Sequence, residues 1–384
     1  PGRPPPRAVL GGARPQRARG PGAARAGGCA SVPGAGERGA TRLLLRCLAG
    51  RRAATASLGS CATVQQRVLG ASPLLVSFGN ARTVRNDNSS RFGKFTKILF
   101  DARGFIQGAA ISTYLLEKSR LVQHAPGERG YHVFCELTAG ASRELRQQLS
   151  LQDTSAFSYL MTEDEAPRAG EAKLDAAHFS DLCGALAACG LDDEATGQGF
   201  EILGAQLHLG AVGFAENEEG DGSRLAGDAQ VAAAATAAAL LGVPAEDLEK
   251  VVTTRSLVTG KAGVGQESYS VPLRVVQAQY SRDAIAKMVY ARLFSWLVGR
   301  INHSLAAHST EADVDSAFIG ILDIYGFENF ERNSLEQLFI QFTNEQLPQH
   351  FATPLFRPPQ ETYAAEGIGG PGLAWEGGSQ ERRG

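Results

Sequence analysis

The stretch NDNSSRFGKF, from Asn86 to Phe95, sets two amides, two hydroxyls, Arg91 and Lys94 between a predicted helix and a predicted strand. Amide and hydroxyl oxygens in a loop are able to ligate Mg²⁺ or hold phosphate oxygens, and an arginine can stabilise charge during phosphoryl transfer. From composition alone, a polar loop of this kind is more often a solvated turn. A nucleotide site is therefore indicated only if a second stretch supports it.

The stretch LDIYGFENF, from Leu322 to Phe330, supplies that support. Its apolar strand ends at Asp323 and runs into a glycine turn, and an aspartate at the end of a buried strand suits an outer-shell role toward Mg²⁺. Gly326 would let the backbone approach a γ-phosphate closely. A single D-x-x-G pattern is weak evidence, so the inference depends on the two stretches occurring together.

The overall composition limits the class of protein. The 384 residues carry a formal net charge of −2 and 43% of them are apolar, which is enough for a sizeable core. A charge so near zero gives no reason to expect a nucleic-acid partner, and no apolar run reaches the length of a membrane span. The six cysteines form no CxxC pair and no metal-binding spacing, so we expect reduced thiols in an intracellular protein.

Hydrophobic patterns predict alternating helices and strands. A strand is expected at 91–101, a strand-turn-strand within 104–122, helices between 175 and 210, two short helices around Pro244, and a strand-loop-strand at 256–275. A buried strand of the parallel-sheet type is expected at 316–327, followed by a helix from about 333 that Pro348 should interrupt. The longest predicted helix, 281–305, places these residues on one face: Ile285, Met288, Val289, Leu293, Leu297 and Ile301.

Taken together, these stretches resemble the myosin motor head. NARTVRNDNSSRFGKF resembles switch I, LDIYGFENF resembles switch II, and NSLEQLFIQFTNEQL resembles the relay helix, in the order of the family. Further similarities lie between and after them: YLLEKSRLV, GERGYHVFCEL, LHLG, SRDAIAKMVYARLFSWLVGRIN and EGI. The resemblance covers roughly residues 40–368 and is closer to an unconventional myosin than to a muscle one.

The resemblance implies an α/β fold: a mixed sheet related to that of P-loop NTPases, with a large helical upper domain, in an incomplete myosin head. It assigns 40–310 to the partial nucleotide-binding core and the upper actin-cleft domain with switch I. It assigns 311–368 to the switch II strand, the relay helix and the start of the lower domain. The Pro/Gly/Arg-rich segment 1–39 and the tail 369–384 are expected to be disordered.

The resemblance also implies how switch I would hold ATP and Mg²⁺. Ser90 would ligate Mg²⁺, and Asp323 would hold the water shell of the metal. Ser89 would position the γ-phosphate and the attacking water. Asn86 and Asn88 would contact phosphate.

For switch II, the resemblance implies that the Gly326 N–H binds the γ-phosphate and that Glu328 pairs with Arg91 when the site closes. The bidentate fork of an arginine suits that pairing. Glu267 would be an actin-binding residue, because myosins carry an acidic or phosphorylatable residue sixteen positions before the one matched here by Asp283. Glu267 would supply that negative charge without phosphorylation. An exposed loop glutamate without such a role is the alternative.

The stretch VPGAGERGATRLLLRC, residues 32–47, departs from the family. In myosins the phosphate loop reads GESGAGKTE, and alignment on ATRLLLRCLA puts Glu37 and Arg38 where the family has Lys and Thr. A glutamate facing the phosphates and an arginine without a metal-donor oxygen should weaken phosphate binding substantially. Either the true segment has been replaced by unrelated sequence, which we favour, or the loop is naturally degraded.

The family activity is actin-stimulated ATP hydrolysis that drives movement along filaments of the cytoplasmic actin cytoskeleton. Because the phosphate loop is altered and no stretch resembles the converter, we predict that this chain hydrolyses ATP poorly or not at all. The alternatives are a catalytically inert actin-binding or scaffold fragment and an incomplete gene product. Actin filaments are the expected partner, and light chains are expected only in a longer form.

Overall fold

The computed structural model describes residues 8–10, 29–31, 66–101, 103–160, 170–261, 264–306, 317–328, 333 and 335–367. The stretch 32–47, with Glu37 and Arg38, lies outside the described residues, as does the tail beyond 367. Within the first 39 residues, strands β1 (Ala8–Leu10) and β2 (Cys29–Ser31) pair antiparallel.

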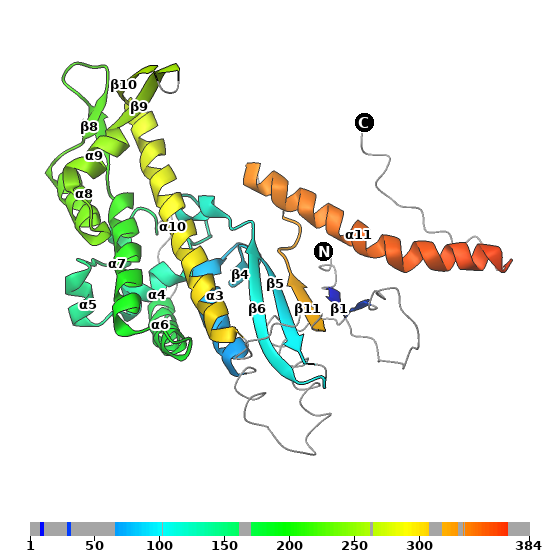
Figure 1. Ribbon diagram of the computed structural model, residues 1–384. Helices are drawn as coiled ribbons and strands as arrows, with labels where there is room; N and C mark the ends of the chain where they lie inside the picture. The colour runs from blue at the N-terminus through cyan, green and yellow to red at the C-terminus, as the bar shows by residue number, and fades with distance from the viewer. Residues whose placement is uncertain are drawn as a thin grey trace.

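A three-stranded sheet in the order β11-β5-β6 stands beside the longest helices (Figure 1). Strand β5 (Gly93–Phe100) pairs antiparallel with both β6 (Ile106–Tyr114) and β11 (Phe318–Asp323). The prediction of a buried, parallel strand at 316–327 is therefore wrong in both respects. An apolar run carries no information on strand direction, and β11 is mostly half-buried, with Phe318 53% exposed. Every strand pair among the described residues is antiparallel.

The segment 104–122 contains one strand, β6, where the sequence predicted two. The short 3-10 helix η1 (Lys118–Leu121) follows it. The region 82–88 forms the loop of a small hairpin in which β3 (Asn80–Ala81) pairs with β4 (Ser89–Ser90). Helix α3 (Ser72–Gly79), with Pro73 in its first turn, leads directly into this hairpin.

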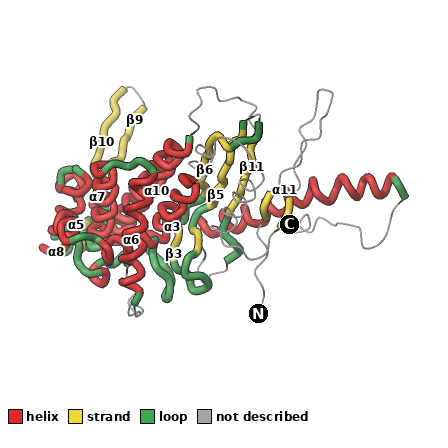
Figure 2. Tube along the Cα trace, turned by 90° about the horizontal axis from the view of Figure 1, so that it is seen from below, coloured by secondary structure: helices red, strands yellow, loops and turns green. Residues whose placement is uncertain are grey.

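A block of helices covers one side of the sheet (Figures 1 and 2). The predicted pair of helices around Pro244 is confirmed. The acidic segment 215–228 before them contains most of a hairpin formed by β7 (Phe214–Glu216) and β8 (Ser223–Leu225). The predicted strand-loop-strand is the hairpin β9 (Thr254–Lys261) and β10 (Val264–Pro272). We call these helices the helical block: α4 (His132–Gly140), α5 (Arg143–Gln148), α6 (Glu171–Ala188), α7 (Asp193–Gly210), α8 (Asp228–Leu241), α9 (Ala245–Thr253) and α10 (Val275–Leu305).

Helix α10 joins the helical block to the sheet. Its buried face includes Tyr290, Leu297 and Ile301, whereas Met288, predicted to lie on that face, is 56% exposed. The buried face runs through Ala286 and Tyr290, one residue after the predicted Ile285 and Val289. The side-chain amide of Asn302 exchanges two hydrogen bonds of 2.7 and 2.8 Å with the backbone of Ile111 in β6.

Helix α11 (Leu335–Ala365) extends away from the rest of the chain in both views (Figures 1 and 2). It continues through Pro348, Pro358 and Pro359, so the predicted interruption at Pro348 is wrong. Each proline removes one backbone hydrogen bond, and the bonds of the neighbouring turns suffice to keep the helix continuous. Within the described part of the chain no single helix is long and apolar enough to cross a membrane; the bent pair α8 and α9 passes that test by length and composition only.

Candidate functional site

The loop between β3 and β4 is shaped by its own asparagines. Thr83 and Asn86 exchange backbone hydrogen bonds of 2.9 and 3.2 Å, and the Asn86 Oδ1 accepts from the Asn88 N–H at 2.9 Å. The Asn88 Oδ1 accepts from Asn80 Nδ2 at 3.0 Å and lies 3.2 Å from His132 Nε2. Both amide oxygens thus hold the loop in shape, and a contact of Asn86 or Asn88 with phosphate stays a prediction.

Arg91 and Glu328 are brought together although 237 positions separate them. The guanidinium donates two parallel hydrogen bonds, each 2.8 Å long, from Nη1 to Oε1 and from Nη2 to Oε2. Its side chain is 0% exposed, and Nη1 also donates to the Ser89 Oγ at 3.0 Å. This bidentate pair, which the resemblance implied, connects the segment after β4 to the segment after β11.

Glu117 is a second carboxylate on Arg91, and sequence reasoning missed it as a site residue. Arg91 Nε donates to Glu117 Oε2 at 2.5 Å, and the same carboxylate accepts from Arg120 Nε at 2.8 Å. Arg120 Nη1 in turn donates to Glu128 Oε2 at 2.8 Å. The only signal in the sequence is a Glu and an Arg three positions apart directly after an apolar strand.

Three carboxylates and two guanidiniums alternate along this series of contacts, so each group has a neighbour of opposite charge. Burial alone would lower the pKa of Arg91, but hydrogen bonds and charge from Glu328 and Glu117 outweigh it and raise that pKa. Burial would raise the pKa of Glu117, yet Arg120 and Arg91 together hold it below its usual value. Arg91 and Glu117 therefore both stay charged inside the protein, which makes the contact a fully ionised one.

Helix α11 is attached to the segment after β11. Asn344 Nδ2 donates to the Gly326 carbonyl at 3.1 Å, and Gln341 Nε2 donates to the Glu328 carbonyl at 2.5 Å. Ser119 of η1 binds Glu336 of α11 through both its N–H, at 3.2 Å, and its hydroxyl. The first turns of α11 are thus hydrogen-bonded both to η1, which follows Glu117, and to the segment that contains Glu328.

Gly326 has open space beside it. A Cβ placed there would meet no described atom within 4 Å, and the backbone of Gly326 does not have a positive φ. The glycine is therefore not required by a turn, and the space fits the approach of a ligand to the backbone.

The remaining predicted residues are placed as follows. Ser90 is half-buried in β4, opposite Asn80, and Asp323 is half-buried at the end of β11, opposite Lys94. The backbone of Glu267 lies in β10, opposite Thr259. Within the described residues, no three His, Cys, Asp or Glu side chains converge as a metal cluster. Mg²⁺ commonly binds one or two protein oxygens together with substrate phosphates, so Ser90 and Asp323 are a chemically suitable pair.

The arrangement defines a class of protein in which two segments far apart in the sequence meet through an arginine–glutamate pair, and one of them is hydrogen-bonded to a long helix. The myosin head (motor domain) family matches residues 29–377. The chain is 38% identical over 361 residues to unconventional myosin-VI of Sus scrofa, 39% over 339 residues to unconventional myosin-XIX of Homo sapiens, and 37% over 342 residues to the myosin ID heavy chain of Dictyostelium discoideum. These alignments cover 88%, 87% and 87% of the chain.

The chain belongs to the myosin head (motor domain) family. It spans 28%, 34% and 30% of the length of these three relatives.

Proposed function

We propose that this chain is part of an actin-based motor whose nucleotide site lies between the segments 86–95 and 322–328. The observation that carries the proposal is the bidentate contact of Arg91 with Glu328. A pair of this geometry strengthens as water leaves, so it suits a site that closes around a charged ligand. The finer fold assignment, a mixed sheet of the P-loop NTPase type, is part of the same proposal.

ATP and Mg²⁺ fit the residues of the site. Ser90 and Asp323 offer hydroxyl and carboxylate oxygens, which are the donors that Mg²⁺ prefers. When bound, the metal would neutralise charge on the phosphates. The Gly326 backbone would bind the γ-phosphate in the space beside it, and Ser89, held by Arg91 at 3.0 Å, would orient the water.

Closure would be transmitted to α11. The carbonyls of Gly326 and Glu328 accept hydrogen bonds from Asn344 and Gln341, so a movement of the 326–328 backbone changes contacts made by α11. This coupling, driven by phosphate contacts, supports a motor rather than a passive scaffold. Actin filaments are the proposed partner, with Glu267 of the β9–β10 hairpin as one contact, and the cytoplasmic actin cytoskeleton is the proposed location.

As a separate proposal, this chain binds and hydrolyses ATP poorly. The sequence places Glu37 and Arg38 where the family has Lys and Thr. Loss of a lysine cation and of a metal-ligating hydroxyl removes two contacts to the phosphate–Mg²⁺ unit, and the glutamate adds repulsion.

Titration of the full chain with a fluorescent ATP analogue tests the two proposals together. We expect weak binding by the wild type. The double variant Glu37→Lys, Arg38→Thr should bind at least about tenfold more tightly, in a Mg²⁺-dependent way, if the loop is naturally degraded, and no more tightly if unrelated sequence replaces it. The control is Glu218→Gln, which changes the net charge by the same amount in a distant loop. Micromolar, Mg²⁺-dependent binding by the wild type would contradict the poor-binding proposal.

Co-sedimentation of the double variant with actin tests the motor class. Actin binding that ATP weakens supports a motor. Binding that ignores ATP indicates an actin-binding scaffold instead, and absence of binding in both conditions contradicts an actin partner for this chain.

A further inference from the structure

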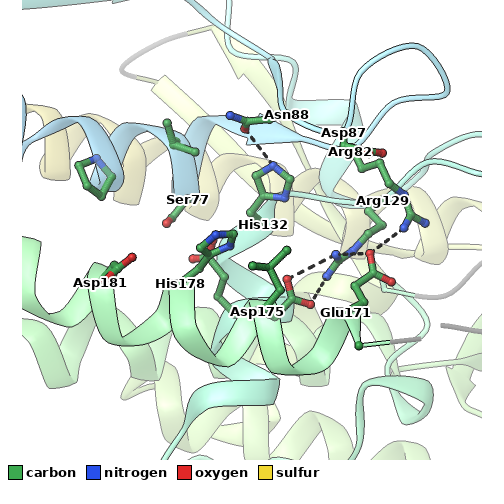
Figure 3. A pocket seen from close by; sticks show the side chains of 15 residues that line it. Ser77, Arg82, Asp87, Asn88, Arg129, His132, Glu171, Asp175, His178 and Asp181 are labelled. Carbon is green, nitrogen blue, oxygen red and sulfur yellow. Dashed lines mark hydrogen bonds and ion pairs between the residues drawn. The ribbon is translucent and has the colours of Figure 1, made fainter. Parts of the chain in front are cut away.

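A cavity of about 560 Å³ lies between helices α3, α4 and α6, beside the loop 82–88 (Figure 3). Ser89, Arg91 and Glu328 do not line it, so it is distinct from the contact that closes the proposed nucleotide site. Its volume is in the range of sites that hold small organic molecules. Of the residues predicted to hold the nucleotide, Asn88 is the one that lines it.

The cavity has a buried floor and an exposed rim. Ser77, Glu136 and Asp175 form the floor and are 4%, 2% and 8% exposed. The rim carries the exposed side chains of Leu174 and Asp181. A small molecule could therefore enter past the rim and reach a polar floor.

Carboxylates outnumber cations in the lining. Five carboxylate residues face two guanidinium groups, those of Arg82 and Arg129. Both guanidiniums are already paired, with Glu171 at 2.7 Å, and Arg129 also contacts Asp175 at 2.7 Å. The excess negative charge selects a cationic ligand over an anionic one.

Glu136 points to the group that the ligand would bind. Its Oε2 is buried and has no hydrogen-bond partner among the described residues. Burial raises the pKa of the Glu136 carboxyl to about 7, so its ionised form is poorly compensated by the protein. A buried oxygen without a donor is costly, and a donor brought by a ligand would remove that cost.

We propose that this cavity binds a small organic cation, an amine with an apolar body. The ammonium group donates hydrogen bonds to Glu136, and the apolar body packs against Pro73, Val76 and Leu174. His132 lines the cavity and lies 3.2 Å from the Asn88 Oδ1, so the occupied cavity contacts the same loop that carries switch I. Asn88 itself also lines the cavity, so a bound ligand contacts the loop for which a phosphate contact is predicted.

The test is a titration of the full chain with 2-phenylethylammonium, followed by nuclear magnetic resonance. Its neutral analogue 2-phenylethanol and its anionic analogue phenylacetate are the comparison probes. We expect the ammonium to bind at least about tenfold more tightly than either, since one charge-assisted hydrogen bond distinguishes them. The resonances of the Asn88 amide and the His132 ring should shift with the ammonium.

Variants locate the binding. Glu136→Gln keeps the shape and removes the charge, and it should abolish the preference for the ammonium. Asp181→Asn, on the exposed rim, does not threaten folding and should weaken ammonium binding by a few-fold. Glu246→Gln, exposed on α9, is the matched control and should bind as the wild type does. Equal affinity for the three probes, or an unchanged preference in both cavity variants, would overturn the proposal.

Discussion

The helical block and helix α11 are held in opposite ways. In the block, large apolar side chains are buried in one continuous core, with Leu297 and Ile301 of α10 at 1% and 0% exposure. On α11, Leu335, Leu338 and Phe342 are all more than 60% exposed, whereas the buried positions include the polar Gln337 and Asn344. Apolar burial therefore stabilises the block, whereas hydrogen bonds attach α11 to η1 and to the segment after β11.

The difference shows where the molecule resists change and where it yields. Apolar contacts are non-directional and accumulate with area, so a packed core tolerates no large displacement without losing much of its stability. Hydrogen bonds to the Gly326 and Glu328 carbonyls are few and directional, so they break and re-form at small net cost. The contacts between α11 and the segment after β11 are therefore the ones that can change at small cost.

The largest expected effect comes from removing the buried cation that joins the segment after β4 to the segment after β11, on which α11 rests. Arg91→Met leaves Glu117 and Glu328 without their shared cation, and we expect a loss of about 4 kcal/mol in the free energy of unfolding. Chemical denaturation measures it. Arg85→Met, exposed in the adjacent loop, is the matched control and should change stability by less than about 0.5 kcal/mol. Similar losses in both variants would contradict a stabilising role for the buried contact.

A smaller difference in unfolding free energy should distinguish an apolar side chain in the helical block from one on α11. Leu297→Ala opens a cavity in the core of the block, and we expect a loss of about 3 kcal/mol. Leu338→Ala removes the same atoms from an exposed site on α11 and should cost less than about 0.5 kcal/mol. Thermal and denaturant unfolding of the pair give the comparison. If Leu338→Ala cost as much as Leu297→Ala, the α11 face would be buried in solution.

The smallest expected effect lies within the block and depends on pH. The pKa of Glu136 is raised by burial from 4.5 to about 7, so the folded chain holds this proton more tightly than the unfolded chain. The stabilisation is complete below pH 4.5 and is lost as the pH rises through about 7. Relative to the wild type, Glu136→Gln should gain about 2 kcal/mol of unfolding free energy between pH 5 and pH 7.

The variant must be compared with the wild type at each pH, because His132 acts in the opposite sense. Burial lowers the pKa of its imidazole from 6.5 to about 3, so its stabilisation is present above pH 6.5 and lost as the pH falls toward 3. Glu246→Gln should follow the wild type throughout. Parallel stability curves for the wild type and Glu136→Gln would contradict the raised pKa.

Part of this fold follows from local pattern. The helix predicted at 281–305, which the structure extends back to Val275, and the two helices around Pro244 were predictable because their apolar signals act within a few residues of one another. Strand direction at 318–323 was not predictable, since parallel and antiparallel neighbours bury an apolar run equally well. The inward place of Tyr290 rather than Met288 depends on what α10 packs against, here Tyr131 at 4.8 Å between ring centroids.

The site divides in the same way. Arg91 and Glu328 could be paired only through the resemblance, because no local rule connects residues 237 positions apart. Glu117 lies in the stretch YLLEKSRLV, but its partner Arg91 is set by tertiary contacts that a single sequence does not contain. Whether the loop amides touch phosphate likewise depends on shape, and the structure shows their oxygens engaged by the protein itself.

The sharing of one guanidinium between two carboxylates has a consequence for reversibility. If Glu328 swings away, the Nε of Arg91 keeps its 2.5 Å contact with Glu117, and no orphaned cation is left in the interior. Glu117 therefore stays on Arg91 when Glu328 leaves, and the charge of Arg91 remains compensated. Breaking the Arg91–Glu328 pair therefore costs less than it would if Glu328 were the sole carboxylate on Arg91.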